Sequence, residues 1–206
     1  MKTEGSLRER LVEVGVHLVM TEGAAAVGLR EIARRAGVSH GAPRRYFPTH
    51  HSLLSAIARR GFADLEARFS AAMAGLTSPR DLLGVFAREY VAYALECRGM
   101  FELMFRHELL DSDRHGSDGP RLRESTLPLF ERLVALVAEC RSAANPPEEP
   151  AVTAAAFWSA LHGLAQLWTW GSLRLVLDAN GAVPDGERLD RLVAEVLDAH
   201  LGPAAP

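Results

Sequence analysis

Cysteine is scarce in this sequence and long hydrophobic segments are missing, and each absence excludes a class of protein. Its 206 residues include two cysteines, Cys97 and Cys140, whose spacing matches neither a zinc motif nor a disulfide framework. No apolar run approaches the roughly 20 residues that a membrane-spanning helix needs. The N-terminal segment MKTEGSLRER lacks the hydrophobic core of a signal peptide. We therefore expect a cytoplasmic protein whose two cysteines are small buried side chains.

Alternation of apolar and polar residues with period two is also missing, so no segment has the pattern of a half-buried β-strand. Apolar residues instead recur at helical spacing, as Leu7, Leu11, Val14 and Leu18 do. The pattern predicts an all-α chain of about nine helices without a sequence repeat. The expected helices span about 7–22, 29–36, 39–47, 50–75, 79–94, 99–110, 120–143, 151–176 and 188–201.

Positive charge is concentrated near the N-terminus, which the net charge of −3 conceals. Residues 1–60 contain ten Lys/Arg and five Asp/Glu, whereas the remaining residues contain 13 and 21. A basic segment on an acidic body is typical of a protein that binds a polyanion, because clustered cations neutralise phosphates whatever the base sequence. A solvated helix face is the alternative interpretation, and charge alone does not decide between the two.

The stretch LREIARRAGVSHGAPRRYF, residues 29–47, has the spacing of a helix-turn-helix. Ile32 and Ala33 lie on the inner face of the first helix, where the small side chain of Ala33 lets two helices cross closely. Gly37 supplies a turn that a side chain would hinder, and Ser39 can cap the second helix, with His40 as the alternative cap. This spacing is far more specific than a single glycine motif.

Pro43 falls where the second helix needs a buried apolar residue against the first. We expect it to pack inward and to make the first turn tight or irregular, because proline has no N–H to donate. Arg44 can then offer two parallel N–H donors to guanine, a contact worth about 1–3 kcal/mol of base discrimination. Arg45 and the hydroxyl of Tyr46 suit phosphates. Either arginine alone could be merely solvated, but the pair on a recognition helix favours DNA binding.

Residues 6–62 resemble the DNA-binding domain of the TetR family of bacterial transcriptional regulators. The resemblance is carried by LREIARRAGVSHGAPRRYFPTHHSLLSAI, and it is strong in the helix-turn-helix and in the Tyr46-Phe47-Pro48 segment. The C-terminal part is similar, more weakly, to a subgroup with a YVAYALE…MFELMF pattern and a Trp…His-Gly signature. That signature falls here on Trp158, His162 and Gly163.

The resemblance implies a symmetric homodimer, held by its last two long helices, that represses transcription until a small molecule enters a cavity in the C-terminal domain. It implies a DNA-binding head in residues 1–50, followed by a connecting helix, and a ligand-binding and dimerisation domain in residues 51–206. The partners are then a palindromic double-stranded DNA operator, a small-molecule effector and a second copy. The implied DNA contacts fall on Arg30, Ser39, His40, Gly41, Arg44, Arg45, Tyr46 and His50.

Two positions depart from the family pattern. Gly28 stands where a serine or threonine usually caps the first helix of the motif, and His50 stands where a lysine usually reaches a phosphate. We therefore expect a weaker cap at Gly28. Neutral His50 can donate one hydrogen bond, but it lacks the fixed charge of lysine.

Aromatic and sulfur-containing side chains recur on successive helices of the larger half. Most such residues belong to a hydrophobic core by default, but a subset can line a cavity for a mostly apolar effector, oriented by His162 or Gln166. The candidate ligand-pocket residues are Tyr90, Tyr93, Cys97, Phe101, Met104, Phe105, Phe130, Trp158, His162, Gln166 and Trp168.

A metal site or an active site is the competing interpretation. His107, Asp111 and His115 recur every four residues, but loop signals from Ser112 onward argue against one continuous helix, so we expect no metal. No nucleophile elbow, phosphate-binding glycine loop or pair of carboxylates stands out, so we expect no enzymatic activity and no cofactor. The alternative to a DNA-binding regulator is an all-α metal-binding sensor or enzyme with an incidental basic N-terminus.

Overall fold

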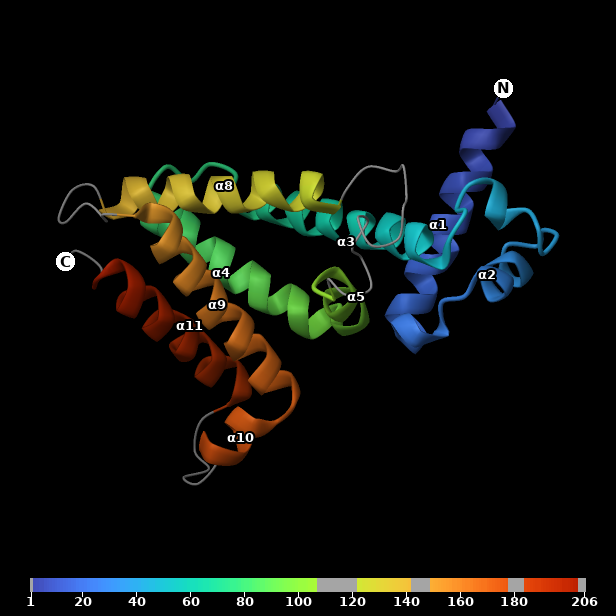
Figure 1. The fold of residues 1–206 in the computed structure, drawn as a ribbon. Coiled ribbons are helices and arrows are strands. Elements are labelled where there is room, and N and C mark those ends of the chain that lie inside the picture. Colours follow the sequence, from blue (N-terminus) through green and yellow to red (C-terminus); the bar gives the residue numbers. More distant parts are fainter. Residues whose placement is uncertain (1, 107–121, 142–148, 178–183, 204–206) are drawn as a thin grey trace. The chain divides into compact units, whose positions relative to one another are not determined.

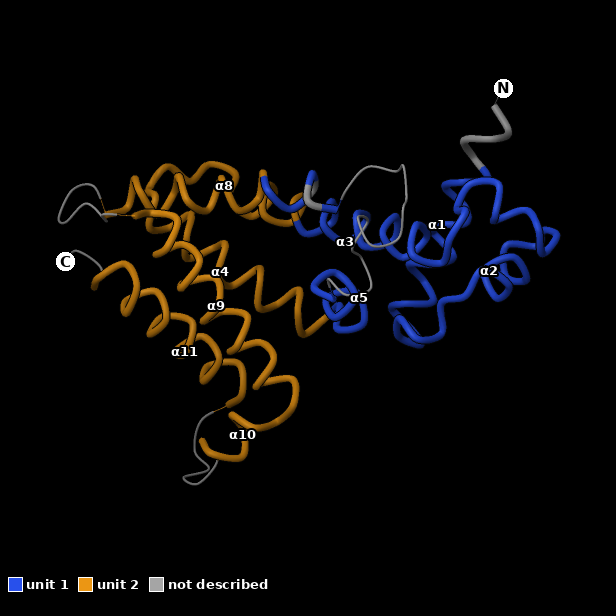
Figure 2. The backbone as a smooth tube through the Cα atoms, in the orientation of Figure 1, with its two compact units in different colours: residues 1–65, 97–127 blue, residues 66–96, 128–206 orange. Residues whose placement is uncertain are grey.

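The structure, a computed structural model, describes residues 2–106, 122–141, 149–177 and 184–203 (Figure 1). These residues form nine α-helices and two 3₁₀-helices and contain no strand, which confirms the expected all-α class. The chain divides into two compact units (Figure 2). Unit 1 comprises Met1–Leu65 and Cys97–Leu127, and unit 2 comprises Glu66–Glu96 and Pro128–Pro206. None of the described helices is both long and apolar enough to cross a membrane.

Unit 1 contains the helices of the N-terminal segment together with two pieces from later in the chain. Its elements are α1 (Lys2–Glu22), η1 (Ala24–Ala26), α2 (Leu29–Arg35), η2 (Pro43–Arg45), the first part of α3 (His50–Ala72), α5 (Arg98–Met104) and the start of α8 (Leu122–Arg141). Its core collects the apolar faces that the helical periodicity predicts. The large, fully buried side chains of this core include Leu11, Leu18, Ile32, Phe47, Leu53 and Ile57.

Close helix crossings in unit 1 depend on glycine. A Cβ atom at Gly99 of α5 would collide with the carbonyl oxygen of Val19 on α1. A Cβ atom at Gly61 of α3 would lie 2.7 Å from side-chain atoms of Met100 and Met104 on α5. Because nothing larger than hydrogen fits at Gly99, α5 packs directly on the backbone of α1.

Unit 2 is a bundle in which α4, α9 and α11 pack against one another (Figure 1). Its elements are the end of α3, α4 (Pro79–Glu96), most of α8 (Leu122–Arg141), α9 (Pro150–Thr169), α10 (Ser172–Leu177) and α11 (Asp185–Leu201). Arg80 at the start of α4 fixes the end of α11, since its guanidinium donates to the Gly202 carbonyl at 2.6 Å and also pairs with Asp198. The core contains Leu83, Phe157 and Leu161, each fully buried.

Most expected helix boundaries are confirmed to within a few residues. Ser78 precedes α4 as the expected cap, and its hydroxyl accepts the N–H of Asp81 at 3.4 Å. Pro128 lies inside α8, as expected. Both cysteines are free thiols, and Cys97 is buried, but Cys140 is only half-buried, against our expectation.

Two expected helices are wrong in extent. The segment expected as one helix over 151–176 is broken into α9 and α10 by Gly171, which has a φ of +79° and donates its N–H to the Trp168 carbonyl at 3.0 Å. A glycine in the left-handed region ends a helix in this way because it carries no Cβ. The helix expected over 99–110 ends at Met104, while residues 107–110 lie outside the described part of the chain.

Candidate functional site

The turn that follows α2 has the geometry of a helix-turn-helix. Gly37 adopts a φ of +66°, which is the left-handed conformation that its place in the motif requires. The N–H of Val38 then donates to the Ala33 carbonyl at 3.0 Å, which closes the end of α2. Ile32 and Ala33 are both fully buried, as the sequence predicts.

Pro43 is buried, which confirms its inward packing, but the segment around it is not the expected α-helix. Only residues 43–45 are helical, and they form the 3₁₀-helix η2. Pro43 has no N–H to donate to the Ser39 carbonyl. The N–H of Ala42 donates to that carbonyl instead, at 3.0 Å, which gives a tighter turn than an α-helix. The N-cap position of η2 is therefore Ala42, which has no side-chain cap, and the expected Ser39 cap is wrong.

The side chains that the sequence assigns to DNA contact lie mainly on the exposed surface of this segment. Arg44 and Arg45 are exposed at the end of η2, and no described residue forms an ion pair with either of them. Tyr46, the next residue, is half-buried. Exposed positions also hold Arg30, Ser39, His40, Gly41 and His50. The segment is anchored by the buried ring of Phe47, over which the guanidinium of Arg8 lies 5.3 Å from the ring centroid.

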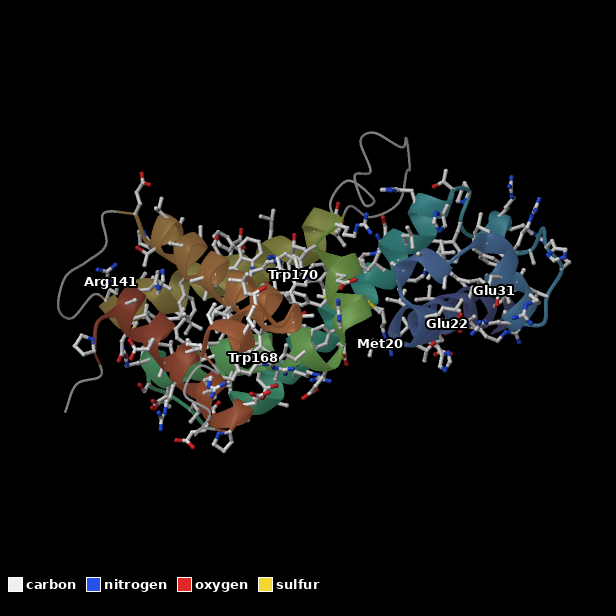
Figure 3. The ribbon with its side chains drawn as sticks, turned by 90° about the horizontal axis from the view of Figure 1, so that it is seen from below. Met20, Glu22, Glu31, Arg141, Trp168 and Trp170 are labelled. Carbon is white, nitrogen blue, oxygen red and sulfur yellow. The ribbon has the colours of Figure 1, made fainter. Side chains whose placement is uncertain are left out.

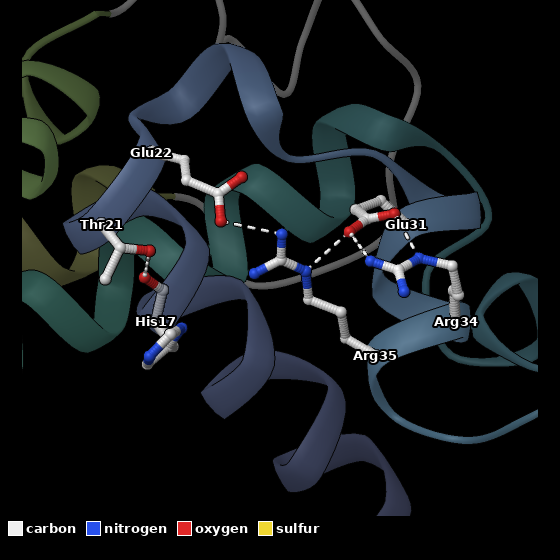
Figure 4. A network of polar contacts seen from close by, with 6 residues as sticks. All are labelled: His17, Thr21, Glu22, Glu31, Arg34 and Arg35. Atoms are coloured by element: carbon white, nitrogen blue, oxygen red, sulfur yellow. Dashed lines mark hydrogen bonds and ion pairs between the residues drawn. The ribbon is translucent and has the colours of Figure 1, made fainter.

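Two other arginines of the basic segment are neutralised by a network that joins α1 to α2 (Figure 4). Glu31 accepts from Arg34 at 2.6 and 2.9 Å and from Arg35 at 2.6 Å, and Arg35 also pairs with Glu22 at 2.8 Å. The hydrogen bonds from Arg34 and Arg35 lower the pKa of Glu31 to about 2. Arg34 and Arg35 of α2 are thus paired within unit 1, whereas Arg44 and Arg45 of η2 form no ion pair with any described residue.

His50, the first residue of α3, does not extend freely into solvent. Its Nε2 atom lies 2.5 Å from the carbonyl oxygen of Val27, so Nε2 carries the hydrogen and donates it. The expected weakness at Gly28 is confirmed, since this N-cap residue of α2 makes no side-chain cap hydrogen bond. The two departures from the family pattern therefore lie side by side at the start of α2.

In unit 2, three of the candidate ligand-pocket residues form one hydrogen-bonded chain between α4 and α9. The indole Nε1–H of Trp158 donates to the Tyr90 hydroxyl at 2.8 Å, and that hydroxyl lies 2.8 Å from Nδ1 of His162. The ring of Phe130 on α8 packs edge-on to Trp158 with centroids 6.4 Å apart. The structure thus brings Tyr90, Phe130, Trp158 and His162 together.

Burial keeps this chain of polar groups uncharged. It raises the pKa of Tyr90 above its ordinary value, and the hydrogen bond from Trp158 opposes that shift only in part. Burial also lowers the pKa of His162. A neutral tyrosine hydroxyl between an indole and an imidazole supplies polarity without charge, which suits recognition of an uncharged guest.

The remaining candidate residues lie elsewhere. Phe101 and Phe105 pack together in unit 1 with centroids 4.8 Å apart, and Met104 and Cys97 are buried in the same unit. In unit 2, Tyr93 lies under the guanidinium of Arg68, and Trp168 lies under that of Arg174. Figure 3 labels Trp168 together with Trp170, which follows α9. Gln166 is half-buried one turn after His162.

Two aromatic residues beside Tyr90 were missed by the sequence analysis. Phe86 stacks on Tyr90 with centroids 6.0 Å apart, and Phe69 stacks on Phe86 at 4.5 Å. The spacing of four residues between Phe86 and Tyr90 on one helix was a readable signal for the first contact. Phe69 comes from α3, so only the fold reveals the second.

The candidate metal ligands His107, Asp111 and His115 lie outside the described residues. Within the described ranges, no group of three or more His, Cys, Asp or Glu side chains is placed to hold a metal ion.

A helix-turn-helix that presents exposed arginines, joined to a larger helical unit, defines a class of DNA-binding transcriptional regulators. Comparison with protein families shows which family of such regulators the chain matches. Residues 11–57 match "Bacterial regulatory proteins, tetR family", and residues 83–200 match "Tetracyclin repressor-like, C-terminal domain". The chain belongs to the TetR family of bacterial transcriptional regulators.

Solved structures share the fold over nearly the whole chain. A protein with unknown function from Rhodococcus sp. RHA1 is 28% identical, with a TM-score of 0.74 and coverage of 97% of this chain and 95% of its own. The TetR transcriptional regulator SCO0520 from Streptomyces coelicolor is 25% identical, with a TM-score of 0.55 and coverage of 96% and 99%. RolR in complex with its ligand resorcinol is 19% identical, with a TM-score of 0.67 and coverage of 99% and 91%. A search of curated protein sequences found no match.

Proposed function

We propose that this regulator is a ligand-responsive repressor that binds a palindromic operator as a homodimer. Residues 1–50 are the DNA-binding head, and residues 51–206 bind the effector and the second copy. The observation that carries the proposal is the pair of exposed, internally unneutralised arginines, Arg44 and Arg45, on a turn anchored by buried Pro43.

The exposed side chains of this turn divide into base-reading and phosphate-binding groups. Arg44 has the planar fork that pairs with the two acceptors of guanine in the major groove. Arg45 and the Tyr46 hydroxyl contact phosphates, which fix the register of the head on the duplex. Supporting contacts come from Arg30, Ser39, His40 and Gly41, all of which are exposed.

A second copy covers an exposed apolar stripe on α9. Three large side chains on this stripe are unusually exposed, since Val152, Leu167 and Trp170 have 59%, 39% and 65% of their surface accessible. Together with the small residues between them they recur at steps of three or four, which places them on one face of α9 and its C-cap residue, Trp170. The stripe consists of Val152, Ala156, Ser159, Gly163, Leu167 and Trp170.

The centre of this stripe is open enough for another helix to approach closely. A Cβ atom built on Gly163 would have no neighbouring atom within 4 Å. α11, which packs beside α9, adds the half-buried apolar residues Leu189, Leu192 and Val196. Two helices from each copy would then form a four-helix interface, which removes the apolar stripe from water.

The effector binds in unit 2 at the hydrogen-bonded chain of Trp158, Tyr90 and His162. Aromatic rings surround this chain, so a small, uncharged and mostly apolar molecule fits its chemistry. RolR has the same fold and was solved with a small aromatic ligand, resorcinol. That relative supports a small-molecule site in this fold, and it does not identify the effector of this chain.

The effector acts through the helix that leads out of its site. Tyr90 lies on α4, and α4 runs into α5, which packs against the backbone of α1 at Gly99. A ligand that favours one position of α4 would therefore change the spacing between the two heads of the dimer. Operator binding requires heads that reach successive major grooves, about one helical turn apart, so the ligand must favour another spacing to release DNA.

The proposal is tested by measuring binding of the chain to duplex DNA from its own upstream region, with and without a small molecule bound to unit 2. All three tryptophans lie in unit 2, so fluorescence quenching reports occupancy there. Resorcinol and other monocyclic phenols are the first probes. We expect a bound probe to weaken DNA binding, whereas unchanged affinity with every bound probe would contradict ligand-responsive repression.

A further inference from the structure

We infer that His50 is a positioning residue for DNA binding, which fixes the start of α2 in place of a side-chain cap. The inference rests on the proposed function, because the quantity that His50 controls is the orientation of the DNA-contacting turn. In this indirect role, Nε2 of His50 donates its hydrogen to the Val27 carbonyl of the same chain and not to a phosphate.

The imidazole of His50 lies at the capped start of α3. Thr49 and Ser52 cap α3 reciprocally, since the Ser52 N–H donates to the Thr49 hydroxyl at 3.0 Å and the Thr49 N–H donates to the Ser52 hydroxyl at 3.3 Å. The Ser52 hydroxyl also donates to the Thr49 carbonyl at 2.8 Å. His50 lies between these two residues, so its backbone is fixed by the cap.

The imidazole of His50 also holds the carbonyl group of Val27, which lies in the short connector before α2. Val27 joins η1 to α2, its side chain is 3% exposed, and its N–H donates to the Ala24 carbonyl at 3.2 Å. Its carbonyl accepts from Nε2 of His50 at 2.5 Å. The connector is therefore held at its side chain, at its N–H and at its carbonyl, and the carbonyl link depends on His50.

The helix α2 has no side-chain cap at its start. Its N-cap residue, Gly28, has an extended backbone with φ −139° and ψ 148° and no side chain to accept the first free N–H groups. Glycine also has the greatest backbone freedom. A carbonyl held one residue earlier, at Val27, restricts where α2 begins, although it does not replace the missing cap hydrogen bond.

The position of α2 affects the DNA-contacting segment because the two are packed together. α2 packs against η2, and Ile32 and Ala33 of α2 and Pro43 of η2 are all buried. A shift of α2 therefore moves the segment that presents Arg44 and Arg45. The carbonyl of Val27 already accepts the Nε2 hydrogen of His50, so a phosphate contact through Nε2 would require His50 to break this link.

The experiment compares four variants of the full chain with the wild type on an operator duplex. His50→Ala removes the link, His50→Gln keeps an N–H donor at a similar reach, Gly28→Ser adds a cap, and the fourth variant combines His50→Ala with Gly28→Ser. Serine fits at position 28 because the backbone is extended and a Cβ there meets no atom within 4 Å. His17→Ala, an exposed histidine on α1, is the matched control.

We expect His50→Ala to weaken operator binding about fivefold, the effect of one neutral hydrogen bond, with an unchanged dependence on salt. His50→Gln, the double variant and the control should stay within about twofold of the wild type. A slope of log affinity against log salt that falls by about 0.9 would show a lost phosphate contact and would overturn the inference. Failure of Gly28→Ser to restore binding in the His50→Ala background would overturn it as well.

Hydrogen exchange at α2 makes the inference testable without DNA. The N–H of Ile32 donates to the Gly28 carbonyl at 2.9 Å and is the first hydrogen bond of α2. It should exchange faster in His50→Ala and return to the wild-type rate when Gly28→Ser is added. Unchanged exchange in His50→Ala would refute the positioning role, whereas wild-type protein that bound no operator would refute only the proposed function.

Discussion

The hydroxyl of Tyr90 on α4 lies 2.8 Å from Nδ1 of His162 on α9, and the same hydroxyl accepts the indole hydrogen of Trp158. In the neutral tautomer of His162 that carries its hydrogen on Nε2, the free Nδ1 accepts the one hydrogen of the Tyr90 hydroxyl. The lowered pKa of His162 favours the neutral imidazole. Protonation of His162 would put a hydrogen on Nδ1, so the Tyr90 hydroxyl would have to turn its own hydrogen away from His162.

The stability of unit 2 should therefore depend on the protonation of His162. Burial lowers its folded-state pKa below the ordinary value of 6.5, so the unfolded chain binds the proton more readily. The stabilisation is present above pH 6.5 and is lost as the pH falls below that value toward the lowered pKa. Urea unfolding followed by tryptophan fluorescence between about pH 7.5 and 5 measures this loss. His162→Gln should flatten it, and an equally steep decline in that variant would contradict the assignment.

Gly99→Ala should destabilise unit 1, because the added Cβ collides with the backbone carbonyl of Val19 where α5 crosses α1. Overpacking of this kind costs about 1–3 kcal/mol. Chemical denaturation followed by circular dichroism gives the change in free energy. Gly186→Ala on α11, where the new Cβ meets no atom within 4 Å, is the control. Equal stability of the two variants would show that the α1–α5 crossing tolerates a methyl group.

Gly163→Leu should leave the folded monomer intact and weaken dimerisation by about tenfold or more. Leucine favours an α-helix over glycine by nearly 1 kcal/mol, and the position is open within one chain. A leucine side chain in the centre of the α9 stripe would, however, keep the second copy away. Analytical ultracentrifugation measures the dimer, with Ala67→Leu on an exposed position of α3 as control. Dimers of wild-type affinity would place the interface elsewhere.

Arg44→Ala should weaken the preference for operator over random duplex, whereas Arg34→Ala should preserve it. Both side chains are exposed and lie on neighbouring elements, but Arg34 is held by Glu31 at 2.6 Å and Arg44 is presented on η2. The expected loss at Arg44 is about 1–3 kcal/mol of discrimination. Competition binding with labelled operator and unlabelled random DNA measures both variants. Equal losses would mean that total charge, and not the recognition turn, carries the specificity.

The head could be predicted from the sequence because its determinants are local. Gly37 adopts the left-handed conformation, and Pro43 has a fixed φ and no N–H. The positions of these two residues in the motif define the turn. The 3₁₀ form of η2 followed from the missing N–H of Pro43, although an α-helix with an irregular first turn was expected. The ion pairs of Glu31 with Arg34 and Arg35 were also readable, at spacings of three and four residues.

Contacts between distant parts of the chain could not be predicted in this way. His50 and Val27 are 23 residues apart, and Tyr90 and His162 are 72 apart. Periodicity shows that each lies on a helix or a connector, but the partner depends on how the helices pack. The break at Gly171 was missed for a different reason, since apolar residues continue on both sides of it and conceal the end of the helix.

Selection of bound duplexes from a random DNA pool tests the central claim, sequence-specific binding by a symmetric pair of heads, most directly. We predict enrichment of an inverted repeat whose half-sites lie about one helical turn apart, about 10–10.5 base pairs centre to centre, and weaker enrichment with Arg44→Ala. A pool that stays random with the wild-type chain at low salt, or one that converges on a single unrepeated half-site, would contradict the account.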